Sequence, residues 1–339
     1  MKTLSGTLTR TVANMAEVSL IDALTMAMAW ELEHDPEVVI LGEDVGVNGG
    51  VFRATAGLQS RFGEDRVHDT PLAEGMIAGI SIGMAMQGMR PIAEIQFMGF
   101  IYPTVDQIIN HAGRIRNRTR GRLTCPMVLR APYGGGIHAP EHHSESTEAL
   151  FAHMPGVRVV IPSSPARAYG LLLAAIRDPD PVVFLEPKRI YRLNKQDVED
   201  NGKALPLDVC YILREGTDVT VVTWGAMIFE TMKAADQLAR NGVSCEVIDL
   251  ATISPIDHET ILESVEKTGR VVIVHEAARS CGVGAEISAI VAEHGMYDLK
   301  GPVRRVTGYD VVMPLFRREM DYLPSVSKIS NAIGAAMHD

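Results

Sequence analysis

The sequence contains few cysteines and no long apolar run, and these absences argue against several classes of protein. Its four cysteines stand far apart in 339 residues, and no two of them form a CxxC pair. Such spacing argues against a disulfide scaffold and against a cysteine-rich zinc site, and it is typical of a reducing compartment. No apolar run reaches the ~18 residues that a membrane-spanning helix needs. We therefore expect a globular protein that does not cross a membrane.

Positive charge is also scarce. The chain has 32 Lys and Arg against 42 Asp and Glu, which gives a formal net charge of -10. Nucleic-acid binding requires clustered Lys and Arg to contact the phosphates. The single basic run, Arg114–Arg122, is short and is more typical of a solvated or interface segment. We therefore expect no nucleic-acid partner.

Several common nucleotide-binding and hydrolase motifs are missing. No GxGxxG follows a predicted strand, no GxxxxGK[ST] occurs, and no GxSxG is present. The first absence excludes a dinucleotide fingerprint and the second a P-loop, while the third excludes an esterase-type nucleophile elbow. Any catalytic chemistry must therefore use other residues.

The N-terminus resembles a targeting segment only weakly. The first sixteen residues contain no acid and carry Lys2 and Arg10 among several Ser and Thr residues. Two basic residues without an apolar stripe are too few for a transit peptide. We expect a short disordered arm over residues 1–17, and a bacterial cytoplasm in preference to a mitochondrial matrix.

Strands and helices alternate along the whole chain, which predicts parallel sheets. Residues 188–207 interrupt the alternation with a polar stretch that we interpret as an interdomain linker. We therefore predict an α/β protein with two parallel-sheet domains, residues 18–187 and a smaller one over 208–339. The expected strands are 38–41, 92–97, 127–130, 157–161, 182–185, 219–222, 245–250, 271–274 and 303–307. The expected helices are 20–33, 74–88, 103–117, 165–176, 228–240, 257–268, 282–293 and 326–337.

Glu74 begins the most distinctive stretch of the sequence, Pro71–Phe100. It heads a helix-like apolar segment with glycines at 75, 79, 83 and 88. Each glycine inside a helix costs ~1 kcal/mol against alanine, so the run predicts close approach of another backbone. A carboxylate beside such apolar residues is either held for a ligand or is a first-turn acid that complements the helix dipole. On the residues alone the second interpretation is the more common case.

Two further segments carry polar residues suited to a site. Glu43 and Asp44 follow a predicted strand, where ligands bind in open α/β sheets, although acids there also form turns. His138, His142 and His143 lie in a glycine-rich loop, together with Glu141 and Glu145. Metal ligation is the weakest interpretation, because adjacent histidines cannot easily face one ion. General acid–base chemistry and a solvated loop both remain open, and the loop is the more common case.

Four long segments, in this order, resemble the β subunit of E1, the thiamine-diphosphate-dependent 2-oxo acid dehydrogenase. They are Gly42–Leu58, Thr70–Phe97, His142–Pro165 and Val182–Arg192, and the segments Asp249–Asp257 and Val272–Ala277 extend the resemblance through the second half. The resemblance covers the chain from Val18 to its end. It implies a pyrimidine-binding domain followed by a transketolase C-terminal-like domain. GGVF and HSESTEALFAHMPG resemble the branched-chain type most.

The resemblance implies roles for five residues. Glu74 matches the glutamate that hydrogen-bonds the pyrimidine ring of thiamine diphosphate, and Phe100 matches an aromatic residue that packs on that ring. Leu72 and Gln96 match neighbours in the same pocket. His143 matches the histidine that serves reductive acylation of the lipoyl group. The resemblance therefore favours the ligand interpretation of Glu74 and the acid–base interpretation of His143.

The resemblance also implies which metals this chain holds. Branched-chain members bind a structural potassium ion near the positions of Asp178 and Asp180, largely through carbonyl oxygens. Asp178 matches, whereas Asp180 stands where those relatives have Asn. This chain has no Gly-Asp-Gly segment with a downstream Asn pair, which holds magnesium diphosphate in thiamine enzymes. The resemblance therefore implies that an α subunit supplies the Mg²⁺ site.

From the resemblance we expect half of an enzyme. The implied assembly is an α₂β₂ heterotetramer in which the helix from Gly75 packs against another subunit. The implied activity is oxidative decarboxylation of branched-chain 2-oxo acids and acylation of the lipoyl group of E2, the acyltransferase partner, which would bind through the second domain. The alternatives are the E1 β subunit of a pyruvate or acetoin dehydrogenase, or a non-catalytic interaction subunit.

Overall fold

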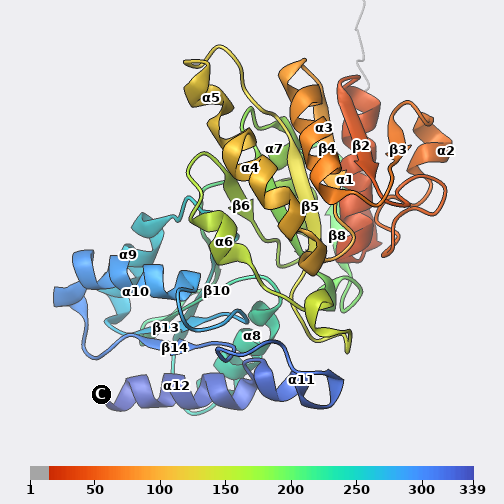
Figure 1. Cartoon of the computed structure of the whole chain (residues 1–339). Coiled ribbons are helices and arrows are strands. Elements are labelled where there is room, and N and C mark those ends of the chain that lie inside the picture. The colour runs from red at the N-terminus through yellow and green to blue at the C-terminus, as the bar shows by residue number, and fades with distance from the viewer. Residues whose placement is uncertain (1–14) are drawn as a thin grey trace, which may run out of the picture.

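The computed structural model describes residues 15–339, which form a seven-stranded sheet, a five-stranded sheet and a small two-stranded sheet. Figure 1 shows the seven-stranded sheet in the upper half of the molecule and the five-stranded sheet below it. In this part of the chain no helix is both long and apolar enough to span a bilayer. The predicted N-terminal arm falls almost wholly outside the described residues, except that 15–17 belong to a strand.

The first sheet has the strand order β12-β6-β7-β5-β4-β2-β3. All of its neighbouring strands run parallel except β12, which is antiparallel to β6. Its central strands are buried along their whole length, because helices cover both faces, and they therefore appear in the sequence as continuous apolar runs. The strands are β2 (Val38–Gly42), β3 (Val67–Asp69), β4 (Arg90–Glu94), β5 (Val128–Tyr133), β6 (Arg158–Val160), β7 (Val182–Pro187) and β12 (Thr252–Ser254).

Two long helices, α1 (Leu20–His34) and α7 (Pro165–Arg177), pack together on one face of this sheet. Ser19 and Asp22 form a capping box at the start of α1, as the sequence predicts. The other face carries α3 (Glu74–Met86), α4 (Val105–Asn110) and α6 (Glu148–Ala152). The short helices α2 (Leu58–Phe62) and α5 (Ile115–Arg118) complete this half.

The second sheet has the order β14-β13-β10-β11-β9 and is parallel except at β9. Helices α8 (Met227–Ala239) and α12 (Val326–His338) pack on one face, and α9 (His258–Thr268) and α10 (Val283–His294) on the other. The short helix α11 (Phe316–Tyr322) lies before α12. The strands are β9 (Tyr211–Arg214), β10 (Val219–Thr223), β11 (Cys245–Asp249), β13 (Val271–Val274) and β14 (Arg304–Val306).

The predicted α/β fold class is confirmed, but the structure corrects several elements. The expected helix over 103–117 is broken into α4 and α5, because the backbone leaves helical geometry at His111. The segment predicted as a plain linker contains β8 (Gln196–Glu199), which pairs antiparallel with β1 (Met15–Val18). Short strands whose partners lie far away in the chain give little local signal, which is why β3, β8 and β9 were not predicted.

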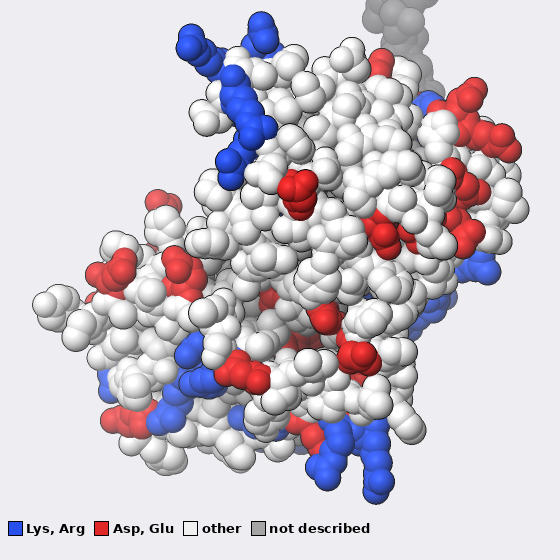
Figure 2. Space-filling model, viewed as in Figure 1, with Lys and Arg blue, Asp and Glu red and all other residues white. Residues whose placement is uncertain are grey.

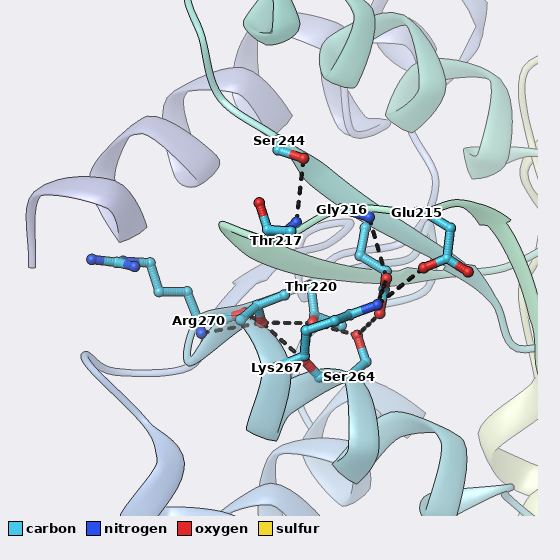
Figure 3. Close-up of polar contacts among 10 residues, drawn as sticks. Glu215, Gly216, Thr217, Thr220, Ser244, Ser264, Lys267 and Arg270 are labelled. Atoms are coloured by element: carbon cyan, nitrogen blue, oxygen red, sulfur yellow. Dashed lines mark hydrogen bonds and ion pairs between the residues drawn. The ribbon is translucent and has the colours of Figure 1, made fainter.

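A buried polar cluster ties β11 to α9 at the N-terminal end of the second sheet (Figure 3). Glu246 is fully buried and accepts hydrogen bonds from Ser264, from Lys267 and from the backbone N–H of Gly216 at 3.2 Å. Burial raises the pKa of Glu246, but these donors outweigh it and hold that pKa below the ordinary value. Because both carboxylate oxygens have partners, we interpret this cluster as structural.

Candidate active site

The candidate site lies where the parallel strands of the first sheet end. Glu43 follows β2, Gln96 follows β4, and Lys188 follows β7. Carboxyl ends of parallel strands meet at one edge of a sheet, and ligands of open α/β sheets bind there. Glu43, Gln96 and Lys188 therefore lie along this edge.

Glu43 is the most unusual residue of the site. Only 4% of its surface is exposed, and its Oε1 atom has no hydrogen-bond partner within the described part of the chain. Burial raises the pKa of Glu43 to about 7, with further contributions from the charges of Glu74, Asp44 and Glu94. A carboxyl group with such a pKa exchanges a proton readily near neutral pH.

Glu74 is the first residue of α3 and is half-buried beside Glu43. Gln96 joins this pair, since its Nε2 atom donates to the carbonyl oxygen of Glu43 at 3.4 Å. The structure therefore brings the predicted residues Glu74 and Gln96 together. The structure also places Glu43 in this site, whereas the sequence indicated only that an acid follows a predicted strand.

His143 lies among aromatic rings. Its ring centroid is 4.0 Å from that of Phe97 and 5.3 Å from that of Phe100, and its Nδ1 atom is buried without a partner among residues 15–339. Burial lowers the pKa of His143, and the charges of His142 and Lys188 lower it further. The neutral imidazole is therefore favoured, and its free nitrogen can exchange a proton. The predicted pair Phe100 and His143 is brought into one cluster.

The histidine loop comes very close to the turn that follows β4. A Cβ atom added to Gly99 would lie 2.1 Å from the carbonyl oxygen of His142, which is far inside van der Waals contact. Only glycine fits at position 99, since any side chain would push the loop away. Phe97, Phe100 and His143 therefore keep their ring contacts because Gly99 has no side chain.

Leu72 is placed differently from the other predicted site residues. Its surface is 80% exposed, and it lies in the segment just before α3. Other large apolar side chains are exposed on α3, at Met76 and Ile80, and in the loop after β2, at Val47 and Val51. The helix predicted to be buried is therefore buried on one face only. Figure 2 shows few charged side chains over α3 and α4, whereas Lys and Arg gather over α5 at the upper left.

The predicted packing role of the glycines of α3 holds in part. A Cβ atom at Gly75 would lie 3.3 Å from the carbonyl oxygen of Pro103, so this glycine admits a segment of the same chain. Gly83 has no neighbouring atom within 4 Å of an added Cβ atom. The surface of α3 at Gly83 is therefore not covered by the described part of this chain.

Asp178 and Asp180 lie at the opposite edge of the sheet, just before β7 begins. Asp178 forms an ion pair with Arg158 at 3.2 Å, and Asp180 forms one with Arg116 at 2.7 Å. The backbone N–H of Asp180 donates to Asp178. Residues 15–339 contain no group of three or more His, Cys, Asp or Glu residues arranged to hold a metal ion. The potassium site, which would rely largely on carbonyl oxygens, stays a prediction.

Lys188 is a site residue that the sequence interpretation placed in a linker. It is 4% exposed, and its ammonium group donates to the carbonyl oxygen of Gly134. Burial lowers the pKa of Lys188 to about 8, although the charges of Glu276 and Glu319 oppose this shift. A lysine gives no local signal of burial, so only the structure could place it here.

The site has the features that a planar, polar ring system requires. Unpartnered buried atoms of Glu43 and His143 lie along one edge of the sheet, and the rings of Phe97 and Phe100 adjoin the imidazole. Carboxyl groups can hydrogen-bond ring nitrogens, while aromatic faces stack against the ring. The residues present therefore fit the pyrimidine end of thiamine diphosphate.

Comparison with known proteins defines the class. Residues 16–194 match the family described as transketolase, pyrimidine binding domain, and residues 209–329 match transketolase, C-terminal domain. A solved split-gene transketolase, described as an inactive β4 tetramer, superposes with a TM-score of 0.72 over 95% of this chain and 99% of that one. At 22% identity this likeness concerns the fold alone. The two domains are those of thiamine-diphosphate-dependent enzymes of the transketolase type.

Curated relatives identify the family. The pyruvate dehydrogenase E1 β subunits of Acholeplasma laidlawii and Bacillus subtilis are 52% and 49% identical, over 93% and 92% of this chain and 97% and 96% of theirs. The 2-oxoisovalerate dehydrogenase β subunit of Bacillus subtilis is 49% identical over 93% of this chain and 94% of its own. This chain belongs to the E1 β-subunit family of 2-oxo acid dehydrogenases. The predicted resemblance is confirmed at this level, while the relatives include both substrate types.

Proposed function

We propose that this chain is the β half of an enzyme that decarboxylates a branched-chain 2-oxo acid and transfers the acyl group to a lipoyl group of E2. The observation that carries the proposal is a chain of contacts at the ends of the strands. Glu43 and Glu74 interact, Gln96 donates to Glu43, and the next residue, Phe97, packs against His143. The chain has carboxylates for a coenzyme ring and an imidazole beside them, but no diphosphate-binding motif of its own. An α subunit would supply that motif and its Mg²⁺.

Two carboxyl groups would act at the ring. Bound thiamine diphosphate supplies the carbanion chemistry needed for decarboxylation. Glu74 would accept or donate a proton at a ring nitrogen, and the raised pKa of Glu43 lets both its neutral and its charged forms exist near neutral pH. The adjoining Phe97 and Phe100 would cover the ring and exclude water, which strengthens these hydrogen bonds.

His143 would serve the second half of the reaction. Its neutral imidazole has an unpartnered Nδ1 atom, which can accept or return a proton when a lipoyl sulfur changes its protonation state. The glycine-rich loop before it carries no bulky side chain over residues 134–136. A lipoyl-lysine arm could therefore approach His143 along this loop.

The assembly follows from the exposed apolar face on α3. Exposed apolar side chains lie on α3 at Met76 and Ile80, just before it at Leu72, and after β2 at Val47 and Val51, and subunit interfaces require such residues. We propose that an α subunit covers them in an α₂β₂ heterotetramer, which would bring Leu72 into the coenzyme pocket. E2 would bind the assembled enzyme through the second half of this chain. The bacterial relatives favour the bacterial cytoplasm over a mitochondrial matrix.

Pyruvate is the second candidate substrate. Pyruvate-type β subunits are 52% and 49% identical to this chain, and a 2-oxoisovalerate-type subunit is 49% identical, so overall identity does not separate the two. The segments GGVF and HSESTEALFAHMPG favour the branched-chain type. Part of the acyl pocket would lie on the α subunit, so the choice needs a measurement.

The proposal is tested by comparing kcat/KM for 3-methyl-2-oxobutanoate, 4-methyl-2-oxopentanoate and pyruvate. The chain reconstituted with its α subunit is expected to favour the branched acids by about tenfold or more, because each buried methyl group adds ~1 kcal/mol or more of binding. The chain alone should show no turnover. Preference for pyruvate would select the second candidate, and turnover without α would contradict the half-enzyme proposal.

His143→Ala should separate the two half-reactions. Transfer of the acyl group to a free lipoyl domain is expected to fall by about 10²-fold or more, because a proton-transferring imidazole is lost. Decarboxylation measured with an artificial electron acceptor should fall much less. His153→Ala, at an exposed histidine away from the site, is the matched control. Equal losses in both assays would indicate a role in binding the 2-oxo acid instead.

A further inference from the structure

A carboxylate from the second half of the chain holds the loop that leads to His143. Glu319, on α11, is fully buried, although its helix neighbours Phe316 and Met320 are 64% and 53% exposed. The backbone N–H of Gly136 donates to its Oε1 atom at 2.7 Å, and that of His138 donates to its Oε2 atom at 2.8 Å. Each carboxylate oxygen therefore binds one backbone amide. Figure 1 shows α11 directly below this loop.

The loop needs such an external support. Between the end of β5 at Tyr133 and the short helical turn Glu141–His143 it forms no helix or strand. Gly134, Gly136 and His138 have φ angles of 80°, 87° and 60°. For histidine, this left-handed conformation is uncommon and costs free energy. The middle of the loop is therefore held by contacts made from outside it.

The contacts around Glu319 are tight. A Cβ atom at Gly135 would lie 2.5 Å from the terminal methyl of Met313, and one at Gly136 would lie 2.2 Å from Cδ of Arg189. The ring of His138 packs edge-on against Phe316, with the centroids 5.5 Å apart. The loop thus fits into a recess formed by the segment that contains α11 and by the turn after β7.

Positive charge lies near Glu319 in this recess. The charge of Glu319 acts on both Lys188 and Arg189, which follow β7. Lys188 also donates to the carbonyl oxygen of Gly134, at the start of the same loop. Two amide donors and this nearby positive charge offset part of the cost of burying the carboxylate, and hydrogen bonds to a charged acceptor are strong.

We propose that Glu319 is a positioning residue for His143. By fixing the amides of Gly136 and His138 it sets the path of the loop, and so the orientation of the imidazole five residues after His138. The second half of the chain would in this way control acyl transfer at a site built by the first half. This inference rests on the role proposed above for His143.

Glu319→Ala and Glu319→Gln, each reconstituted with the α subunit, test the proposal. Hydrogen exchange followed by mass spectrometry should show faster exchange over residues 134–145, by about tenfold or more in the Ala variant, because two backbone amides lose their acceptor. The Gln variant keeps one acceptor oxygen, so its exchange rate should lie between those of the unmodified protein and the Ala variant. Acyl transfer to the lipoyl domain should fall by about tenfold in the Ala variant, while artificial-acceptor decarboxylation stays within about twofold.

Asp321→Asn is the matched control, since this carboxylate lies on the same helix but is exposed and forms an ion pair with the exposed Arg318. It should change neither exchange nor acyl transfer. Unchanged exchange in both Glu319 variants, or faster exchange with unchanged acyl transfer, would overturn the positioning role. If His143→Ala itself leaves acyl transfer intact, the proposed role of His143 fails and the positioning role fails with it. If only His143→Ala impairs transfer, the proposed function stands and the Glu319 inference falls.

Discussion

Glu74→Gln in the reconstituted heterotetramer should lower decarboxylation by about 10²–10⁴-fold, the range that a positioned acid–base group contributes. Glutamine preserves the size of the side chain and one hydrogen-bond acceptor, but it cannot accept or release a proton. The rate is best measured with an artificial electron acceptor, so that acyl transfer through His143 does not limit it.

The matched control is Glu64→Gln, which neutralises an exposed carboxylate in the turn before β3 and should leave the rate unchanged. Size-exclusion chromatography should show that both variants assemble with the α subunit. A Glu74→Gln enzyme that assembles and retains its full rate would show that the carboxylate of Glu74 takes no part in the chemistry. The coenzyme assignment would then be wrong.

Arg130→Met should lower the free energy of unfolding by about 3–5 kcal/mol, the usual cost of removing one partner of a buried ion pair. Arg130 is 2% exposed on β5 and lies between two buried carboxylates. Its Nε and Nη2 atoms donate to Glu186 at 2.7 and 3.0 Å, and Nη1 donates to Glu94. Without the guanidinium group, both carboxylates would remain in the core without a cation.

The pH dependence of this loss provides a second measurement. Burial already raises the pKa of Glu94, and Arg130 opposes that shift, so the variant should raise it further. An acid whose folded-state pKa is raised destabilises the protein above its unfolded-state pKa and ceases to do so as it becomes protonated. The stability deficit of Arg130→Met should therefore shrink as the pH falls from about 8 to about 5.

Denaturant unfolding of the isolated chain gives the comparison. Arg61→Met breaks an exposed ion pair with Glu33 and should change stability little, because solvent screens that pair. Adding Glu186→Gln to Arg130→Met should recover part of the loss. An Arg130→Met chain no less stable than Arg61→Met would contradict the assigned role of the buried cluster.

The local pattern of the sequence was enough to predict most of the fold. Buried parallel strands require continuous apolar runs, and amphipathic helices require caps, so β2, β10 and α1 could be located from their own residues. The pairing of strands that are far apart in the chain gives no such local sequence pattern. β12, far along the chain, joins the edge of the first sheet at β6, and β8 pairs with the N-terminal strand.

In the candidate site, too, the sequence indicated individual residues but not the contacts between distant segments. Long motifs were sufficient to mark Glu74, Phe100 and His143, and the structure places Phe100 and His143 in ring contact. The unusual pKa of Glu43 was not predictable, because it depends on burial and on the charges of Glu74 and Glu94, which lie on other elements.

By itself the sequence determined the class of protein, the order of the longer helices and strands and the side chains able to do chemistry, because these depend on residue identity and local spacing. Only the tertiary structure decided which of those side chains meet. Lys188 is buried in the core, although its sequence position predicted a linker. Glu319, in the second half of the chain, binds the loop before His143. Burial and charge proximity arise from contacts between distant segments, and these contacts exist only once the chain has folded.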